Sequence, residues 1–341
     1  MANTIVKPDL ESVEAQVFAK LSLGQPLVLI TIIKSEGSAP RHAGTHALFS
    51  NEGFSGTVGG GILEAKTIEL AKSALETATS QLGNFFLAND AASDMICGGK
   101  LEVLCEFLTP DAHSAFAKAK LALSSGKAGQ WVVKIKKDLN NRVTIDRSFL
   151  EVEKGACPQK ILLVDNGDLL IYTEPLIPKP LLLLCGGGHV ALEVAELAAK
   201  CDFSVDVVDD RAEFANKERF PWARKCYVLP AYTNLRAVCG VSHEHYVAIM
   251  TRGHKYDSDV LEQVLAGPIK YVGMIGSLRK REEVYAKLKA HGISHDTLAK
   301  VYCPIGLSFP TETPQQIAVA VVAELLAAKG QVLQDFRPTV L

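Results

Sequence analysis

Three small residues followed by an acidic one form the strongest chemical pattern in the sequence. The spacing Gly186-x-Gly188-x-x-Ala191, with Asp209 about twenty residues further on, is typical of a dinucleotide-binding turn. In such a turn the first glycine permits a tight bend, the second lets a pyrophosphate approach the backbone, and the small third residue allows close helix–strand packing. The acidic side chain would accept hydrogen bonds from a ribose 2′-hydroxyl. The pattern therefore predicts nucleotide binding in the second half of the chain.

Polar residues follow two further strands that we predict in this half, at 246–250 and 270–274. Ligands of open α/β sheets bind at the carboxyl ends of strands, so we expect these residues near the glycine turn. Arg211, close to Asp209, leaves open whether the nucleotide carries a free 2′-hydroxyl or a 2′-phosphate. The candidate binding residues of this half are Gly186, Gly188, His189, Asp209, Arg211, Thr251, His254, Asp257, Gly276 and Ser277.

A second group of candidate residues lies in the first half of the chain. Ser38 and Arg41 belong to a polar loop expected at 34–45, and Gly59, Gly60 and Gly61 precede a helix expected at 62–77. Consecutive backbone N–H groups before a helix form an anion-binding nest, with Arg41 as a nearby cation. Two simpler readings stay open. The loop could be a solvated surface segment, and Glu64 could serve the positive end of the helix instead of a ligand.

Cys97 stands before two glycines, ahead of a strand expected at 101–107. A cysteine in a glycine turn is more accessible than one inside a strand, and neighbouring N–H groups would lower its pKa. Cys97 is therefore a candidate nucleophile or soft metal ligand. By contrast, Cys185 and Cys201 flank apolar runs and are expected in the core. The spacing of the cysteines and histidines matches no zinc motif, so we assign no metal site beyond Cys97 as a candidate soft ligand.

The elements that must position these residues suggest two domains. The order strand, turn, helix, strand over 181–211 is a βαβ unit, and strands and helices alternate from there to the C-terminus. This predicts an α/β protein whose C-terminal part is a Rossmann-like doubly wound parallel sheet. The first half mixes helices with hairpins expected around 131–146 and 161–172, which indicates an N-terminal α+β domain. Three prolines within 173–180 suggest an extended link, so we place the domains at 1–175 and 176–341.

The composition narrows the classes of function. With 341 residues the chain suits two domains, and a net charge of −2 argues against binding nucleic acid or acidic membranes through bulk electrostatics. No apolar run approaches the length of a membrane span, and the first residues lack the pattern of a signal peptide. We therefore expect a cytoplasmic protein whose eight cysteines are thiols.

Short motifs in one fixed order make the chain resemble the XdhC/CoxI family, also called xanthine dehydrogenase accessory factors. They are GSAPR at 37–41, GTVGGGILE at 56–64, CGG at 97–99, GGGH at 186–189, VVDDR at 207–211, TRGHKYD at 251–257, GMIGS at 273–277, CPIGL at 303–307 and TPQQIA at 313–318. The resemblance covers nearly the whole chain. It departs from the family pattern at Cys185 and in the TPQQIA segment, which lacks the usual glutamate.

The resemblance implies a cofactor chaperone without turnover of its own. Such a protein would bind the molybdenum cofactor (molybdopterin), support its sulfuration and insert it into an apo molybdenum hydroxylase. A sulfurtransferase or a cofactor nucleotidyltransferase would be further partners, and the resemblance points to a homodimer. The glycine nest and Arg41 suit the cofactor phosphate, and Cys97 suits a contact to molybdenum or sulfur. The C-terminal domain would take NAD(P) or the nucleotide part of a cytidylated cofactor.

Two other classes of function stay open. An NAD(P)-dependent oxidoreductase is supported by the dinucleotide spacing, with His254 near Asp257 as the best acid–base candidate. A catalytic subunit of a molybdenum hydroxylase is disfavoured, because the chain lacks iron–sulfur cysteine clusters and is short for a large molybdenum domain. We further predict that the two glycine-lined sites, one in each half, share a single cleft.

Overall fold

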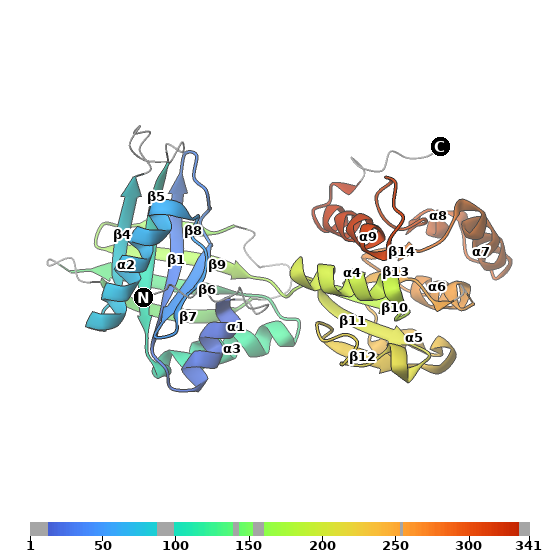
Figure 1. The fold of residues 1–341 in the computed structure, drawn as a ribbon, viewed down its shortest axis with the longest axis horizontal. Coiled ribbons are helices and arrows are strands. Elements are labelled where there is room, and N and C mark those ends of the chain that lie inside the picture. The colour runs from blue at the N-terminus through green and yellow to red at the C-terminus, as the bar shows by residue number, and fades with distance from the viewer. Residues whose placement is uncertain (1–12, 87–98, 139–142, 153–159, 253–254, 334–341) are drawn as a thin grey trace. The chain divides into compact units, whose positions relative to one another are not determined.

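The computed structural model describes residues 13–86, 99–138, 143–152, 160–252 and 255–333 (Figure 1). The chain divides into two compact units, Met1–Pro178 and Lys179–Leu341. The proline-rich segment expected to be a link begins inside a strand. Residues 173–176 belong to β9 (Leu169–Leu176), because they pair antiparallel with β6 (Gly129–Lys137).

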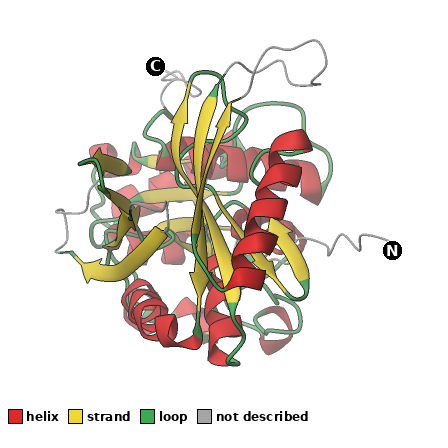
Figure 2. Ribbon diagram, turned by 90° about the vertical axis from the view of Figure 1, so that its left-hand side faces the viewer, coloured by secondary structure: helices red, strands yellow, loops and turns green. Residues whose placement is uncertain are grey.

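The first unit contains two antiparallel sheets and three α-helices within its described part. The first sheet has the order β3-β2-β1-β5-β4, and the second has the order β7-β6-β9-β8. The remaining strands are β1 (Leu27–Glu36), β2 (His46–Ser50), β3 (Gly53–Gly56), β4 (Gln81–Phe86), β5 (Lys100–Leu108), β7 (Val143–Glu151) and β8 (Leu162–Asp165). The helices are α1 (Val13–Ser22), α2 (Gly61–Thr77) and α3 (His113–Ser124). Figure 2 shows the long helix α2 lying along the strands of the first sheet.

Strand β1 is buried on both faces, which explains its unbroken apolar run. Val28 and Ile30 pack with the buried face of α2, whereas Leu27 and Leu29 pack with α1, α3 and the second sheet. The polar loop expected from residue 34 begins later than predicted. Past an irregularity after Ile32, β1 continues to pair with β5 as far as Glu36, so the loop is shorter.

The second unit is a six-stranded parallel sheet covered by helices on both faces, as predicted. The strand order is β12-β11-β10-β13-β14-β15. Its strands are β10 (Leu181–Cys185), β11 (Ser204–Asp209), β12 (Lys225–Val228), β13 (Tyr246–Ile249), β14 (Tyr271–Met274) and β15 (Val301–Tyr302). Helices α4 (His189–Lys200) and α9 (Pro314–Lys329) cover one face. The other face is covered by α5 (Leu235–Cys239), α6 (Asp257–Leu265), α7 (Leu278–Ala290) and α8 (His295–Leu298).

The strand order determines where this unit can bind a ligand. From β10 the chain moves through β11 to β12 on one side, and then returns to place β13, β14 and β15 on the other side. The direction of winding therefore reverses between β10 and β13. In doubly wound sheets a crevice forms outside the carboxyl ends of the strands at such a reversal.

The residues at the start of α9 explain why this helix begins where it does. A capping box begins α9: the Thr313 side chain accepts from the Gln316 backbone N–H, and the Gln316 side chain accepts from the Thr313 backbone N–H. Pro314 takes the first helical position, where its missing N–H costs nothing. Within the described ranges, no helix combines the length and the apolar character needed to cross a membrane.

Candidate functional site

The glycine turn after β10 is shaped by close packing at two positions and by open space at the third. A Cβ atom at Gly186 would lie 2.2 Å from the Met250 carbonyl oxygen, and one at Gly187 would lie 2.0 Å from the Phe214 carbonyl oxygen. At Gly188, the residue that precedes α4, a Cβ atom would meet nothing within 4 Å. The turn therefore leaves room for a ligand above the first N–H groups of α4, which is where an anion is favoured.

Asp209 braces this turn from the end of β11. Its Oδ2 accepts from the Gly187 N–H at 2.8 Å, and its Oδ1 accepts from the backbone N–H of Arg211 at 3.0 Å and from Arg211 Nε at 2.9 Å. Burial acts to raise the pKa of Asp209, but the hydrogen bonds from Arg211 and Gly187 outweigh it and lower the pKa. The carboxylate is fully buried, so ribose binding by Asp209, which stays a prediction, would require an exchange of these contacts.

Two arginines flank the Phe214 ring next to the turn. The guanidinium carbon of Arg211 lies 3.7 Å from the ring centroid, and that of Arg219 lies 5.0 Å from it. Arg219 Nε donates to the Gly187 carbonyl at 3.1 Å, while its buried Nη2 has no hydrogen-bond partner among the described residues. No sequence pattern singled out Arg219, because it stands in a segment without a motif. It adds a cation beside the start of α4.

Polar residues also gather at the carboxyl ends of β13 and β14. Thr251 donates to Asp257 Oδ1 through its N–H at 3.1 Å and its hydroxyl at 2.5 Å. Lys280 Nζ contacts the other carboxylate oxygen of the fully buried Asp257 and donates to the Ile275 carbonyl at 2.8 Å. Lys280 was not among the predicted site residues, although it lies three residues after the predicted Ser277.

The residues after β14 shape the path of the Lys280 side chain. A Cβ atom at Gly276 would lie 2.6 Å from Lys280 Cδ, so the lysine side chain passes directly over this glycine on its way to Asp257. Ser277 caps α7 by accepting from the Lys280 N–H at 3.3 Å. The expected closeness to the glycine turn is found at Thr251, whose Cα would lie 3.0 Å from a Cβ at Gly186. His254 lies outside the described residues, and the exposed His189 begins α4.

Three motifs of the first unit meet at the start of α2. A Cβ atom at Gly59 would lie 2.7 Å from Pro40 Cγ, and one at Gly99 would lie 2.7 Å from the Ser38 carbonyl oxygen. The loop at 37–41 therefore packs between the glycine cluster and the last residue of the CGG motif. Cys97 itself lies outside the described residues.

The start of α2 has the features of an anion-binding nest. Gly60 and Gly61 have φ values of 79° and 60°, which favour glycine, and a Cβ atom at either would meet nothing within 4 Å. No described side chain caps this helix end. Glu64 Oε2 instead accepts from the Thr57 hydroxyl at 2.8 Å and from the Val58 N–H at 3.2 Å, so Glu64 braces the loop. Arg41 is exposed and pairs with no described residue.

A buried polar network connects the two sheets of the first unit. His46 Nε2 lies 2.9 Å from Glu174 Oε1, and the Tyr172 hydroxyl donates to Glu174 Oε2 at 2.9 Å. Burial acts to lower the pKa of His46, but the hydrogen bond and the charge of Glu174 raise it overall. We assign this network a structural role. Across the described part of the chain, no cluster of three or more His, Cys, Asp or Glu side chains is arranged to hold a metal ion.

Comparisons with known proteins extend over both units. Residues 182–325 match the family model described as the XdhC Rossmann domain, and residues 21–85 match that of the XdhC and CoxI family. A protein of Bacillus subtilis (strain 168), named as a probable subunit of xanthine dehydrogenase, is 27% identical over 320 residues. The match covers 89% of this chain and 94% of that protein.

Two further relatives were found. The uncharacterized protein YqeB of Escherichia coli (strain K12) is 24% identical over 307 residues, and the match covers 89% of this chain but only 44% of YqeB. A crystal structure described as a xanthine dehydrogenase from Bacillus halodurans superposes with a TM-score of 0.75 at 24% identity, covering 96% of this chain and 98% of that one. This last likeness shows a shared fold.

Proposed function

Because this chain belongs to the XdhC and CoxI family, we propose that it is an accessory factor for a molybdenum hydroxylase of the xanthine dehydrogenase type. The Bacillus subtilis relative, whose name places it with xanthine dehydrogenase and which matches over most of both chains, supports this assignment. In this role the protein binds the molybdenum cofactor, supports its sulfuration and inserts it into the apoenzyme. It acts in the cytoplasm as a homodimeric chaperone, with a sulfurtransferase or a nucleotidyltransferase as a further partner.

The observation that carries the proposal is the meeting of three motifs at the start of α2. No described side chain caps this helix start, a Cβ atom at Gly60 or Gly61 would meet nothing within 4 Å, and Arg41 supplies a cation that no described residue neutralises. A phosphate is the group that this chemistry fits best. Molybdopterin would bring such a phosphate together with a pterin and a dithiolene. Cys97, two residues before the packed Gly99, remains our predicted contact to sulfur or molybdenum.

The second unit would hold a nucleotide in the same function. Open space at Gly188, the start of α4 and the nearby Arg219 suit a pyrophosphate or a nucleotide phosphate. This nucleotide would be NAD(P) or the nucleotide part of a cytidylated cofactor. A second candidate function, an NAD(P)-dependent oxidoreductase, is favoured by the same open position at the reversal of strand order.

Gel filtration of the full chain with molybdopterin tests the cofactor proposal. We expect cofactor to co-elute with the wild-type protein and with Arg279→Ala, a control at an exposed arginine of α7. Arg41→Ala should lose most of the bound cofactor, and Arg41→Lys should retain part of it, because a lysine keeps the charge but not the planar fork. Co-elution that is absent from the wild type, or equal in all four proteins, would contradict the proposal.

Titration with NADH and NADPH, followed by nicotinamide fluorescence, separates the second candidate. Saturable binding that is lost in Gly188→Val would support a nicotinamide nucleotide at the turn. Turnover of NADPH with a small-molecule acceptor, without any molybdopterin, would favour the oxidoreductase over the chaperone. Absence of saturable binding for both nucleotides would remove this candidate and leave the cofactor test unaffected.

A further inference from the structure

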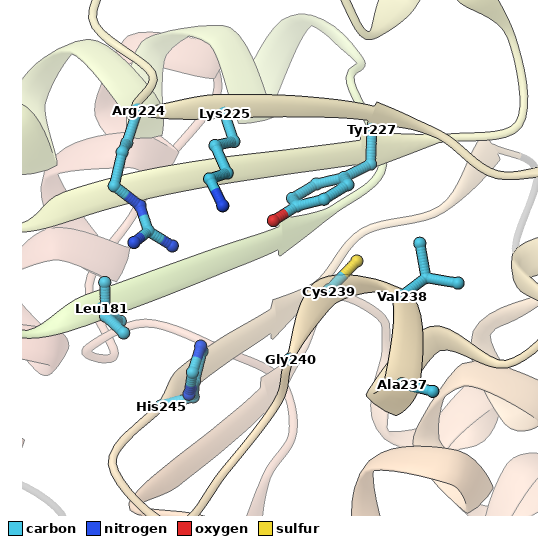
Figure 3. Close-up of a pocket in the computed structure, with 9 residues that line it drawn as sticks. All are labelled: Leu181, Arg224, Lys225, Tyr227, Ala237, Val238, Cys239, Gly240 and His245. Atoms are coloured by element: carbon cyan, nitrogen blue, oxygen red, sulfur yellow. The ribbon is translucent and has the colours of Figure 1, made fainter. Parts of the chain in front are cut away.

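The second unit contains a cavity at the amino-terminal edge of its parallel sheet, opposite the edge that carries the glycine turn (Figure 3). Its volume is about 290 Å³. Leu181 is the first residue of β10, Lys225 is the first residue of β12, and His245 immediately precedes β13. Because these strands are parallel, their first residues share one edge. No residue assigned to the nucleotide site lines this cavity.

Cationic and hydroxyl groups of one segment point into the cavity from above in Figure 3. Arg224 is held by the buried Asp206, to which its Nε donates at 2.9 Å and its Nη2 at 2.5 Å. This bidentate contact orients the guanidinium and leaves its Nη1 for another acceptor. Lys225 and Tyr227 are two residues apart on β12, and neither the ammonium nor the hydroxyl has a hydrogen-bond partner among the described residues.

His245 supplies a donor from the opposite wall. Its Nδ1 accepts from the Ser242 N–H at 3.1 Å, so the neutral ring carries its hydrogen on Nε2. Burial lowers the pKa of His245, which keeps this ring neutral near pH 7. The charge of Arg224 is offset by Asp206, whereas that of Lys225 is offset by no described carboxylate. The cavity therefore offers several donors and an excess of positive charge.

We propose that this cavity is a second ligand site, which binds a small phosphate monoester or a similar compact oxyanion. The oxyanion would accept from Lys225, Tyr227 and the free edge of Arg224, with His245 as a neutral donor. Leu181 and Val238 supply an apolar wall for a short carbon chain. A volume of about 290 Å³ is near the lower limit for small-molecule sites, so the cavity suits a phosphate with a few carbons.

Isothermal titration of the full chain with inorganic phosphate, in a buffer without other oxyanions, tests the site. We expect saturable binding that weakens by about tenfold in Lys225→Met and by a smaller factor in Tyr227→Phe. Propyl phosphate should bind more tightly than inorganic phosphate, because its carbons lie on the apolar wall. Val238→Ser should remove most of that difference.

The control variants distinguish this site from the glycine-lined sites and from loss of folding. Lys300→Met removes an exposed lysine elsewhere on the same unit and should bind phosphate like the wild type. Gly188→Val and Arg41→Ala alter the other candidate anion sites and should retain the binding component that Lys225→Met loses. Thermal melting should show all variants folded. Equal binding by the wild type and Lys225→Met, or no saturable binding by the wild type below about 10 mM, would overturn the proposal.

Discussion

The backbone N–H of Gly187 donates to the carboxylate of Asp209 at 2.8 Å, which joins the end of β11 to the turn after β10. The same carboxylate orients Arg211, whose guanidinium lies over the Phe214 ring. An acidic residue that the spacing predicts as a ribose acceptor is therefore also the support of the glycine turn. Any ligand at this turn meets a backbone whose shape Asp209 holds.

Removing this support should destabilise the second unit. Asp209→Ala leaves the buried Gly187 N–H without its acceptor and removes the partner of Arg211, so we expect a loss of about 2–4 kcal/mol in the free energy of unfolding. Asp202→Ala, which breaks an exposed pair with Lys179, should cost less than about 1 kcal/mol. Urea unfolding followed by circular dichroism measures both. Equal losses would show that Asp209 does not brace the turn.

Gly187 and Gly188 should differ in their tolerance of alanine. Gly187→Ala places a Cβ atom against the Phe214 carbonyl oxygen, and we expect a loss of about 1–3 kcal/mol through overpacking. Gly188→Ala adds a methyl group to open space and should change stability by less than about 0.5 kcal/mol. Thermal denaturation of the two variants tests this order. A Gly188→Ala protein as unstable as Gly187→Ala would mean that Gly188 does not border an open site.

The free energy of unfolding should depend on both members of the ion pair between Lys280 and Asp257. Lys280→Met leaves a fully buried carboxylate without its cation, so we expect a loss of about 3–5 kcal/mol. Arg279→Met, one residue earlier and largely exposed, serves as the matched control and should change stability little. Lys280→Met/Asp257→Asn should recover part of the loss. No recovery in the double variant would show that the loss arises from packing instead of charge.

The stability of the first unit should fall as the pH rises through the range in which His46 loses its proton. Glu174 raises the pKa of His46 in the folded state above its unfolded value of about 6.5. The protonated pair therefore stabilises the fold fully below about pH 6.5, and this contribution disappears as the pH passes the higher folded value. His46→Gln should flatten the dependence. The urea midpoint of unfolding of the wild type and of His46→Gln, measured from about pH 5 to about pH 9, tests this dependence. Parallel curves of midpoint against pH would contradict the assignment.

The sequence predicted the second unit well and the first unit only in part. Alternating strands and helices, together with the glycine turn, specify a doubly wound sheet because each signal is local. The order of the strands in the first unit depends on contacts between distant segments. The extension of β1 to Glu36, for example, arises from pairing with Lys100, which no local pattern of polar residues reveals.

The same distinction applies to the candidate sites. The positions of Thr251, Asp257 and Gly276 at one edge of the sheet could be predicted, because these residues follow strands whose carboxyl ends meet there. Arg219 and Lys280 were missed, because each reaches its site through a long side chain that begins some distance away. The partners of Asp209 were also beyond prediction, since a spacing rule gives the position of a carboxylate and not which donors it accepts from. The predicted shared cleft between the two glycine-lined sites remains a prediction.

Strand β1 has a consequence for how the first unit opens. Its two faces belong to different hydrophobic clusters, one containing α2 and the other containing α1, α3 and the second sheet. Separating either cluster from β1 exposes the same backbone hydrogen bonds to β2 and β5. The amide protons of this strand should therefore exchange with solvent only in a concerted opening of the whole unit, and their slow exchange would report the integrity of both layers at once.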